Sequence, residues 1–173
     1  MGDLEFRQAV PADAAAVRSL VTRAYRGEIG WTTESHLLTD ERIDHDGVVT
    51  KITEPDGLVQ LTMLDDRLIA CCELHSRADT TAYFGLFAVE PDLQAGGIGR
   101  RVLAEAERTV VARWRSTVME MQVVGQRPEL IDWYVRRGYR LTDQRRPFPY
   151  DKLVNGAALR PDLYFAVLTK VLD

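Results

Sequence analysis

Three closely spaced glycines lie where a β-like run gives way to a strongly helical one. From Val89 to Arg101 the chain reads Val-Glu-Pro-Asp-Leu-Gln-Ala-Gly-Gly-Ile-Gly-Arg-Arg. Backbone N–H groups in the first turn of a helix have no partner within the helix, and the helix dipole favours negative charge at that end. The stretch therefore predicts a site for a phosphorylated ligand.

Two common phosphate loops do not fit this stretch. A dinucleotide fingerprint would need a third glycine where the chain has Val102, and the preceding strand is not the first of the chain. A P-loop needs Gly-Lys followed by Ser or Thr, whereas here Gly99 is followed by Arg100 and Arg101. Two interpretations remain: a nest of amides around a small anion, or a glycine-rich turn without a ligand.

Composition predicts one soluble domain that spans residues 1–173. Apolar residues make up 46% and charged residues 28%, and the net charge is −4. An acidic chain argues against nucleic acid as the main partner. No apolar run approaches the roughly 18 residues of a membrane span, and no secretion signal is visible. We expect a cytoplasmic protein without a membrane partner.

The potential metal ligands form no recognisable site. Cys71 and Cys72 are adjacent, so on a strand they would point to opposite faces and would not form a disulfide with each other. The histidines at 36, 45 and 75 and the two cysteines lack the spacing of a zinc site. We expect no metal and two reduced, buried or half-buried thiols.

Hydrophobic periodicity predicts an α/β (α+β) chain with one mixed sheet. Three consecutive strands with short turns predict an antiparallel meander, and the helix after the third implies a parallel crossover to the next strand. The expected strands are 4–10, 58–64, 67–75, 80–89, 117–124, 139–144 and 160–172. The expected helices are 11–26, a short one from Thr32 or Thr33 through Leu38, a weak one over 39–54, 101–115 and 127–137.

Two motifs together resemble the GNAT superfamily of N-acyltransferases. Gln94-x-x-Gly97-x-Gly99, directly after a strand, is similar to the acyl-CoA-binding motif of that superfamily. The stretch from Leu130 to Tyr139 is similar to its helix that ends in aromatic-x-x-x-Gly-aromatic. The resemblance implies a mostly antiparallel central sheet with helices on both faces, splayed between the fourth and fifth strands. The Gly-Trp-Thr-Thr-Glu segment at 30–34 resembles one little-characterised branch of this superfamily. This finer resemblance does not indicate a substrate.

The resemblance implies acetyl-CoA as cosubstrate. Amides from Ala95 to Arg100 would cradle its pyrophosphate, and the edge of the preceding strand would pair with its pantetheine arm. An amide N–H, that of Val89 or a neighbour, would stabilise the oxyanion. Arg100 and Arg101 either add charge at the phosphates or are solvated. The predicted cofactor-binding residues are Phe87, Ala88, Val89, Gln94, Ala95, Gly96, Gly97, Ile98, Gly99 and Arg100.

Tyr134 falls on the tyrosine position of the family and is the expected general acid, since a phenol can protonate a departing thiolate. The alternative is an aromatic packed in the core. Some family members use a glutamate as base where this chain has Gln122. Candidate bases are therefore Glu120, on the same strand face, and Glu73, on an earlier strand, with a chain of water molecules as an equal alternative.

The family usually selects its acceptor with the first two helices and the loop between the last strands. The residues there are Glu28, Trp31, Thr32, Glu34, Phe148 and Tyr150. Acidic residues beside a tryptophan would suit a cationic amine. Alternatively, Trp31 anchors a short helix and Glu34 only caps it.

These features lead to one functional hypothesis and one alternative. The first is an N-acetyltransferase that moves an acetyl group from acetyl-CoA to a primary amine of a small molecule or peptide, by direct attack in a ternary complex. The alternative is a non-catalytic acyl-CoA-binding sensor on the same fold. A homodimer through the late strands is compatible with the family, although no residue specifies it.

Overall fold

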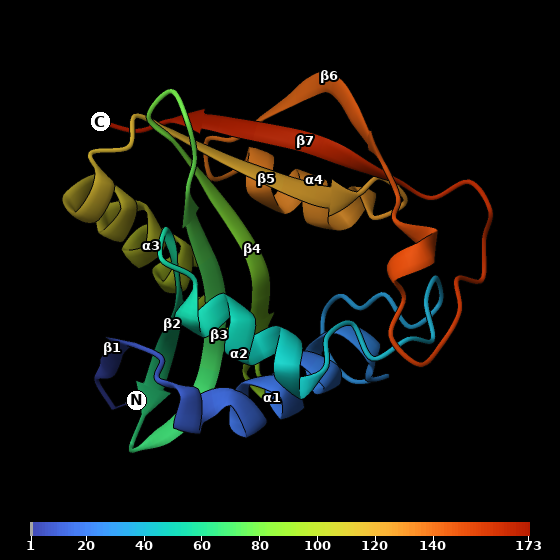
Figure 1. Ribbon diagram of the computed structural model, residues 1–173, viewed down its shortest axis with the longest axis horizontal. Coiled ribbons are helices and arrows are strands. Elements are labelled where there is room, and N and C mark those ends of the chain that lie inside the picture. Colours follow the sequence, from blue (N-terminus) through green and yellow to red (C-terminus); the bar gives the residue numbers. More distant parts are fainter. Residues whose placement is uncertain (1) are drawn as a thin grey trace.

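The computed structural model describes residues 2–173, which form a seven-stranded sheet and four α-helices (Figure 1). The strands are β1 (Leu4–Gln8), β2 (Gly57–Leu64), β3 (Arg67–Ser76), β4 (Thr81–Val89), β5 (Val118–Val124), β6 (Arg140–Pro147) and β7 (Tyr164–Val171). The α-helices are α1 (Ala14–Arg26), α2 (His45–Thr53), α3 (Ile98–Trp114) and α4 (Pro128–Val135). Short 3₁₀ turns lie at Pro11–Asp13, Pro91–Leu93 and Tyr150–Lys152.

The strand order is β1-β2-β3-β4-β5-β7-β6, and every neighbouring pair is antiparallel except β4 and β5. Strands β2 to β4 form the predicted meander. The α3 helix connects β4 to β5 and so allows their parallel pairing. The predicted mixed, mostly antiparallel sheet is confirmed.

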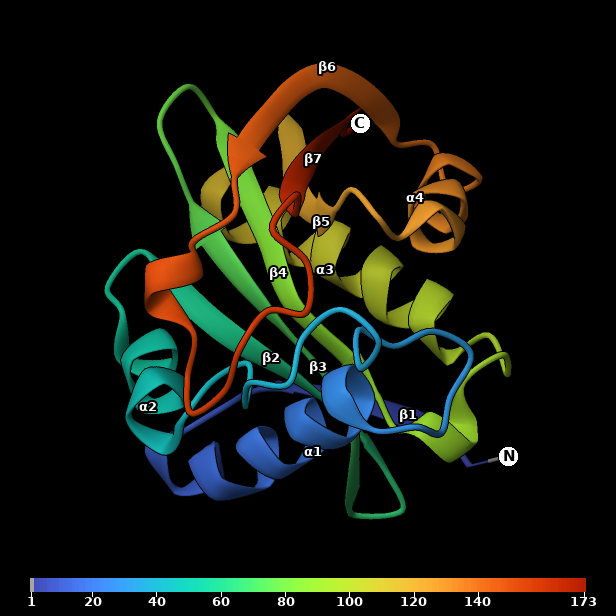
Figure 2. The same ribbon diagram turned by 90° about the vertical axis from the view of Figure 1, so that its right-hand side faces the viewer.

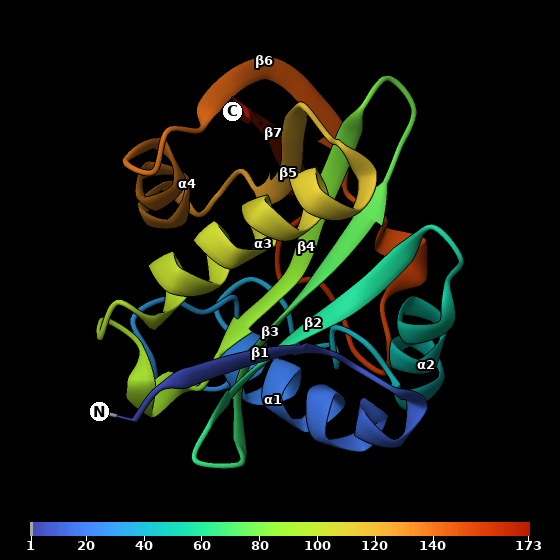
Figure 3. The ribbon, with the colours of Figure 1, turned by 90° about the vertical axis from the view of Figure 1, so that its left-hand side faces the viewer.

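Helices cover both faces of the sheet, as predicted (Figures 2 and 3). Residues from α1 and α2 pack in one core with Cys71, whereas residues from α3 and α4 pack in another with Cys72. Successive strand residues point to opposite faces, so the two adjacent cysteines enter different cores. Both thiols are free and buried. Within residues 2–173, no helix has the length and apolar character needed to cross a bilayer.

Strands β4 and β5 separate after four paired residues. Their parallel register runs from Thr81 opposite Val118 to Phe84 opposite Met121 and then stops. Leu86 adopts a left-handed backbone (φ 46°), and the β3–β4 register shifts here, which marks a bulge that redirects the strand. The edge of β4 from 85 to 89 is therefore not paired with β5, and the two strands diverge in Figure 1. This is the predicted splay.

Several element boundaries differ from the predictions. The α3 helix begins at Ile98 instead of residue 101, because its first turn includes the glycine loop. The predicted helix through Leu38 is only a turn, in which the N–H groups of Leu37 and Leu38 both donate to the Glu34 carbonyl. The weak helix over 39–54 forms only at His45–Thr53, where the Asp44 side chain accepts a hydrogen bond from the Gly47 N–H and caps the helix.

Candidate active site

The glycine loop has the geometry of a backbone nest. Ala95 (φ 67°) and Gly97 (φ 82°) are both left-handed, and Gly97 is the N-cap of α3. No side chain caps this helix, and the N–H groups of residues 98–100 find no acceptor among residues 2–173. Alternating backbone hands turn successive amides towards one point, where the helix dipole also favours an anion.

A cavity of about 330 Å³ opens beside this loop. Its walls come from the end of β4, the loop, the start of α3 and one face of α4. Of the predicted cofactor-binding residues, eight line it: Phe87, Ala88, Val89, Gln94, Ala95, Gly97, Gly99 and Arg100. Gly96 and Ile98 do not line it, and Ile98 instead packs in the core.

Gln94 ties the loop to the strand that precedes it. Its side-chain nitrogen donates to the Val89 carbonyl (3.1 Å), and its side-chain oxygen accepts from the Trp31 N–H (2.6 Å). The Glu90 N–H donates to the Ile69 carbonyl on β3 (2.8 Å). Adjacent residues of a strand point their N–H groups to opposite edges, so the Val89 N–H faces the splay.

An aromatic wall closes the cavity on the α4 side. Trp133 packs against Phe87 (ring centroids 6.1 Å apart) and Tyr134 (5.1 Å). A Cβ atom on Gly99 would lie 3.3 Å from Trp133 and 3.4 Å from Phe87, so a side chain there would crowd the wall. Glycine at this position keeps the cavity open.

Positive charge is concentrated at the mouth of this cavity. The Arg137 guanidinium stacks on Trp133 (3.7 Å to the ring centroid), and its Nε is buried without an acceptor among the described residues. Burial lowers the pKa of Arg137, and the neighbouring Arg136 and Arg100 lower it further. A bound anion would relieve all three effects. The residues present thus fit a phosphorylated cofactor such as coenzyme A.

Tyr134 lies where this cavity meets a second one. The residue is 4% exposed, and its ring makes edge contacts with Phe84, Trp133 and Tyr139. Its hydroxyl has no hydrogen-bond partner within residues 2–173, and the side chain lines both cavities. Burial raises the pKa of Tyr134 well above its ordinary value. The phenol is therefore protonated at neutral pH and able to donate.

The second cavity, of about 120 Å³, adjoins the first at the splay. It is formed by β4 and β5 around the point where their pairing ends, the end of α1, the segment before α2 and the loop before β7. Both cavities share Tyr25, Phe87, Arg127, Leu130 and Tyr134. The two spaces therefore meet across the open edge of β4.

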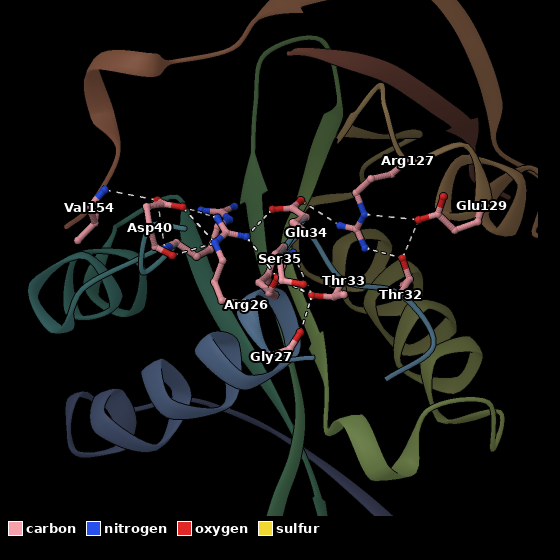
Figure 4. A network of polar contacts seen from close by, with 12 residues as sticks. Arg26, Gly27, Thr32, Thr33, Glu34, Ser35, Asp40, Arg127, Glu129 and Val154 are labelled. Atoms are coloured by element: carbon pink, nitrogen blue, oxygen red, sulfur yellow. Dashed lines mark hydrogen bonds and ion pairs between the residues drawn. The ribbon is translucent and has the colours of Figure 1, made fainter. Parts of the chain in front are cut away.

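A buried ion-pair network fixes the segment between α1 and α2 against the start of α4 (Figure 4). The Glu34 carboxylate accepts from Arg26 (2.6 Å) and Arg127 (2.9 Å). Arg26 also donates to Asp40 (2.7 Å). Arg127 further donates to the Thr32 hydroxyl (2.8 Å). The segment 26–40 and the distant Arg127 thereby hold the wall of both cavities.

Neither candidate base lines a cavity. Glu73 is buried and pairs with Lys51 (2.8 Å). Glu120 pairs with Arg77 (3.0 Å) and Arg146 (3.5 Å), in the part of the sheet where β4 and β5 are still joined. Gln122 does line the smaller cavity. Its amide cannot take up a proton.

The predicted acceptor residues are distributed over three places. Trp31 and Thr32 line the larger cavity, whereas Glu34 and Phe148 line the smaller one. Glu28 is exposed and lines neither. Tyr150 also lines neither; its hydroxyl donates to the Arg160 carbonyl (3.0 Å) and holds the loop before β7. Each position remains a prediction about acceptor binding.

Sequence reasoning missed several residues at the junction. Tyr25, Arg42 and Arg127 line one or both cavities but were not predicted as site residues, because only tertiary folding brings them to the splay. Trp133 and Arg137 lie within the second motif, where their i, i+4 spacing could have indicated that the two side chains lie side by side. Among residues 2–173, no three His, Cys, Asp or Glu side chains group as metal ligands.

Solved structures show the same fold. The PaiA N-acetyltransferase from Thermoplasma acidophilum, in complex with coenzyme A, aligns with a TM-score of 0.75 at 16% identity over 98% of this chain and 99% of that chain. The IAA acetyltransferase from Bacillus cereus aligns with a TM-score of 0.69 at 18% identity, over 98% of this chain and 100% of that chain. The ribosomal-protein-S18-alanine N-acetyltransferase from Escherichia coli aligns with a TM-score of 0.71 at 15% identity, over 99% of this chain and 95% of that chain. At these identities the likeness establishes the fold alone.

Sequence comparison identifies the family more directly. A search of curated protein sequences gives no match to this chain. Residues 15–140, however, match the Acetyltransferase (GNAT) family, a stretch that includes the glycine loop, Tyr134 and both cavity-forming ends of β4 and β5. The chain belongs to the GNAT acetyltransferase family.

Proposed function

We propose that this protein is an N-acetyltransferase that transfers an acetyl group from acetyl-CoA to a primary amine by direct attack in a ternary complex. The observation that supports this most strongly is the meeting of two cavities at Tyr134, across the unpaired edge of β4. One cavity includes an amide nest suited to phosphates, and the other is lined by β4, β5 and the segment between α1 and α2. Donor and acceptor can thus approach each other from two directions.

The residues of the larger cavity would bind and orient the donor. Amides of residues 98–100 and the guanidinium of Arg137 would hold its phosphates, and the free edge of β4 would pair with its pantetheine arm. The Val89 N–H faces the same edge and would donate to the thioester oxygen, where negative charge develops as the amine attacks. This donor is part of a strand that β3 holds in place.

Tyr134 would supply the proton to the leaving group. A thiolate is a stronger base than the solvent, and a protonated phenol at the junction of the cavities can donate to it as the carbon–sulfur bond breaks. Burial raises the pKa of Tyr134, so the phenol is protonated before each turnover and would donate a hydrogen bond to the developing thiolate.

The amine would lose its proton to water. The carboxylates that line the smaller cavity, Glu34 and Asp40, are engaged by Arg26 and Arg127. Glu73 and Glu120 are ion-paired and lie outside both cavities. A route through water, one of the alternatives from the sequence, therefore fits the geometry better than either glutamate.

The test compares Tyr134→Phe with Tyr139→Phe in an assay that measures thiol release from acetyl-CoA over a panel of primary amines. Both variants remove one hydroxyl from the same aromatic cluster, but the Tyr139 hydroxyl donates to Glu107 (3.0 Å) away from the cavities. We expect Tyr134→Phe to lower kcat by about 10²-fold or more without weakening acetyl-CoA binding. Tyr139→Phe should retain kcat. Equal kcat values for the two variants would contradict the role of Tyr134.

A sensor function has one observation in its favour, namely that no unpaired carboxylate lines either cavity among residues 2–173. Such a protein would bind acetyl-CoA in a titration and release no thiol with any amine. Turnover of any amine by the wild-type protein, lost in Tyr134→Phe, would exclude it. A protein that binds no acetyl-CoA at all would refute both functions.

A further inference from the structure

One arginine in the smaller cavity has no carboxylate partner among the described residues. Arg26 and Arg127 both line this cavity, and carboxylates hold each of them. Arg42 lines it too, yet its guanidinium finds no hydrogen-bond acceptor and no carboxylate within ion-pair distance in the described part of the chain. Its contact is the face of the Tyr25 ring, with 5.3 Å from the guanidinium carbon to the ring centroid.

The backbone fixes Arg42 at this place. Its φ of 64° is left-handed, a conformation that few residues other than glycine adopt, and its N–H donates to the Asp40 carboxylate (3.3 Å). Asp40 also binds Arg26 and the Val154 N–H, so the turn that carries Arg42 is anchored on two sides.

The charge around the smaller cavity is positive. Its lining includes Arg26, Arg42, Arg127 and Lys152 but only two carboxylates, Glu34 and Asp40. Both carboxylates are taken up by Arg26 and Arg127, and Lys152 is exposed to solvent, which screens its charge. Among the arginines of the cavity, only Arg42 therefore lacks a direct carboxylate partner within the described residues. Its charge favours a ligand with a single negative group.

Neutral donors flank the guanidinium. Tyr25 and Tyr83 line the same cavity, and the hydroxyl of neither has a hydrogen-bond partner within the described residues. Burial raises the pKa of Tyr25 to about 12 and also raises that of Tyr83, so both phenols stay protonated. A planar carboxylate could accept two parallel hydrogen bonds from an arginine and one more from a phenol.

We propose that Arg42 binds the carboxylate of the acceptor, and that the acceptor is a small amino acid, a molecule with both an amine and a carboxylate. This inference rests on the proposed function and adds the substrate class. The cavity of about 120 Å³ is well below the 300–1,000 Å³ of sites for drug-sized ligands, so it suits a small molecule. Tyr25 contacts Arg42 and lines both cavities, so it lies between the guanidinium and the junction where the amine would meet the thioester.

The test uses matched acceptors at saturating acetyl-CoA. Each α- or ω-amino acid of a panel is compared with its carboxamide, its decarboxylated amine and its aminophosphonate. We expect kcat/KM to be highest for the amino acid, by about ten- to a hundredfold over the amide, as befits a hydrogen-bonded charged group. Equal or better turnover of the uncharged amines, or of the aminophosphonate, would overturn the proposal.

The matched variants are Arg42→Gln and Arg108→Gln. The second removes the same charge from an exposed position on α3 that lines neither cavity. Arg42→Gln should raise KM for the amino acid by about ten- to a hundredfold and leave the low rate with the amide unchanged. If Arg42→Gln fails to fold, Arg42→Lys takes its place, because it keeps the charge but not the planar fork. Its KM for the amino acid should lie between the value for the wild type and the value expected for Arg42→Gln. A proportional loss for amino acid and amide alike would overturn the assignment.

A binding measurement separates this inference from the proposed function. The same amino acids are titrated into the coenzyme A-bound protein and detected by calorimetry. Binding that Arg42→Gln abolishes and Arg108→Gln retains would support the carboxylate site even if no thiol were released, in which case only the proposed function would fail. Absence of binding by every amino acid of the panel would refute the carboxylate site.

Discussion

Replacement of Glu34 by glutamine tests whether buried ion pairs hold the wall of both cavities. The carboxylate of Glu34 lies between the guanidinium groups of Arg26 and Arg127, at 2.6 and 2.9 Å. The three side chains are only 7%, 8% and 6% exposed. Water therefore cannot replace the lost charge, and the change leaves positive charge buried without its counterion.

The cost falls mainly on Arg127. After the change, Arg26 keeps the Asp40 carboxylate at 2.7 Å. Arg127 keeps only the Thr32 hydroxyl (2.8 Å) and a distant contact to Glu129 (3.9 Å), and its Nε is already buried without an acceptor. Removal of one partner from a buried pair costs about 3–5 kcal/mol. Glutamine still offers one oxygen, so we expect a loss of about 3 kcal/mol in the free energy of unfolding.

Urea unfolding measures this loss. With a slope of about 2 kcal/mol per molar for a domain of this size, the midpoint should fall by about 1.5 M. Asp162→Asn is the control, because it makes the same change of carboxylate to amide in the exposed pair with Arg160 (2.7 Å). The control should leave the midpoint almost unchanged, since exposed pairs contribute little. Equal midpoints for Glu34→Gln and the control would refute the reasoning.

Three further predictions concern the loop, pH and the capping of α2. Gly97→Ala should weaken acetyl-CoA binding about fivefold, because alanine is strained in the left-handed backbone at this position (φ 82°). Gly96→Ala is the control and should bind normally, because its Cβ would meet only the Leu93 carbonyl at 3.4 Å. Equal affinities of the two variants for acetyl-CoA would contradict the nest. Hydrogen bonds from Arg23 lower the pKa of Glu90, so Glu90→Gln should destabilise the protein at pH 7. The difference in urea midpoint between this variant and the wild type should disappear as the pH falls through that lowered pKa. A difference that stays constant with pH would refute this prediction. Asp44→Ala should cost about 1 kcal/mol in urea unfolding, and no loss would show that the hydrogen bond to the Gly47 N–H is unimportant.

Local patterns in the sequence were sufficient for most elements of the fold. The glycines at 96, 97 and 99 indicated an anion site at a helix start, and the structure places left-handed residues and unpaired amides there. Hydrophobic periodicity predicted the meander and the crossover, because side-chain spacing and connection length constrain both. The error at the start of α3 came from the same glycines, which lower helix propensity but here form the first turn.

The acceptor side, by contrast, depends on contacts between residues far apart in the chain. Glu34 and Arg127 are separated by 93 positions, and no periodicity or motif links them. The same holds for Arg42 and Tyr83, which line one cavity although they are far apart in the sequence. The sequence by itself determined the donor loop, whose chemistry is contained in consecutive backbone amides. Only the tertiary structure decided the acceptor cavity, because side chains from distant elements must pack together before charge is paired or left unpaired.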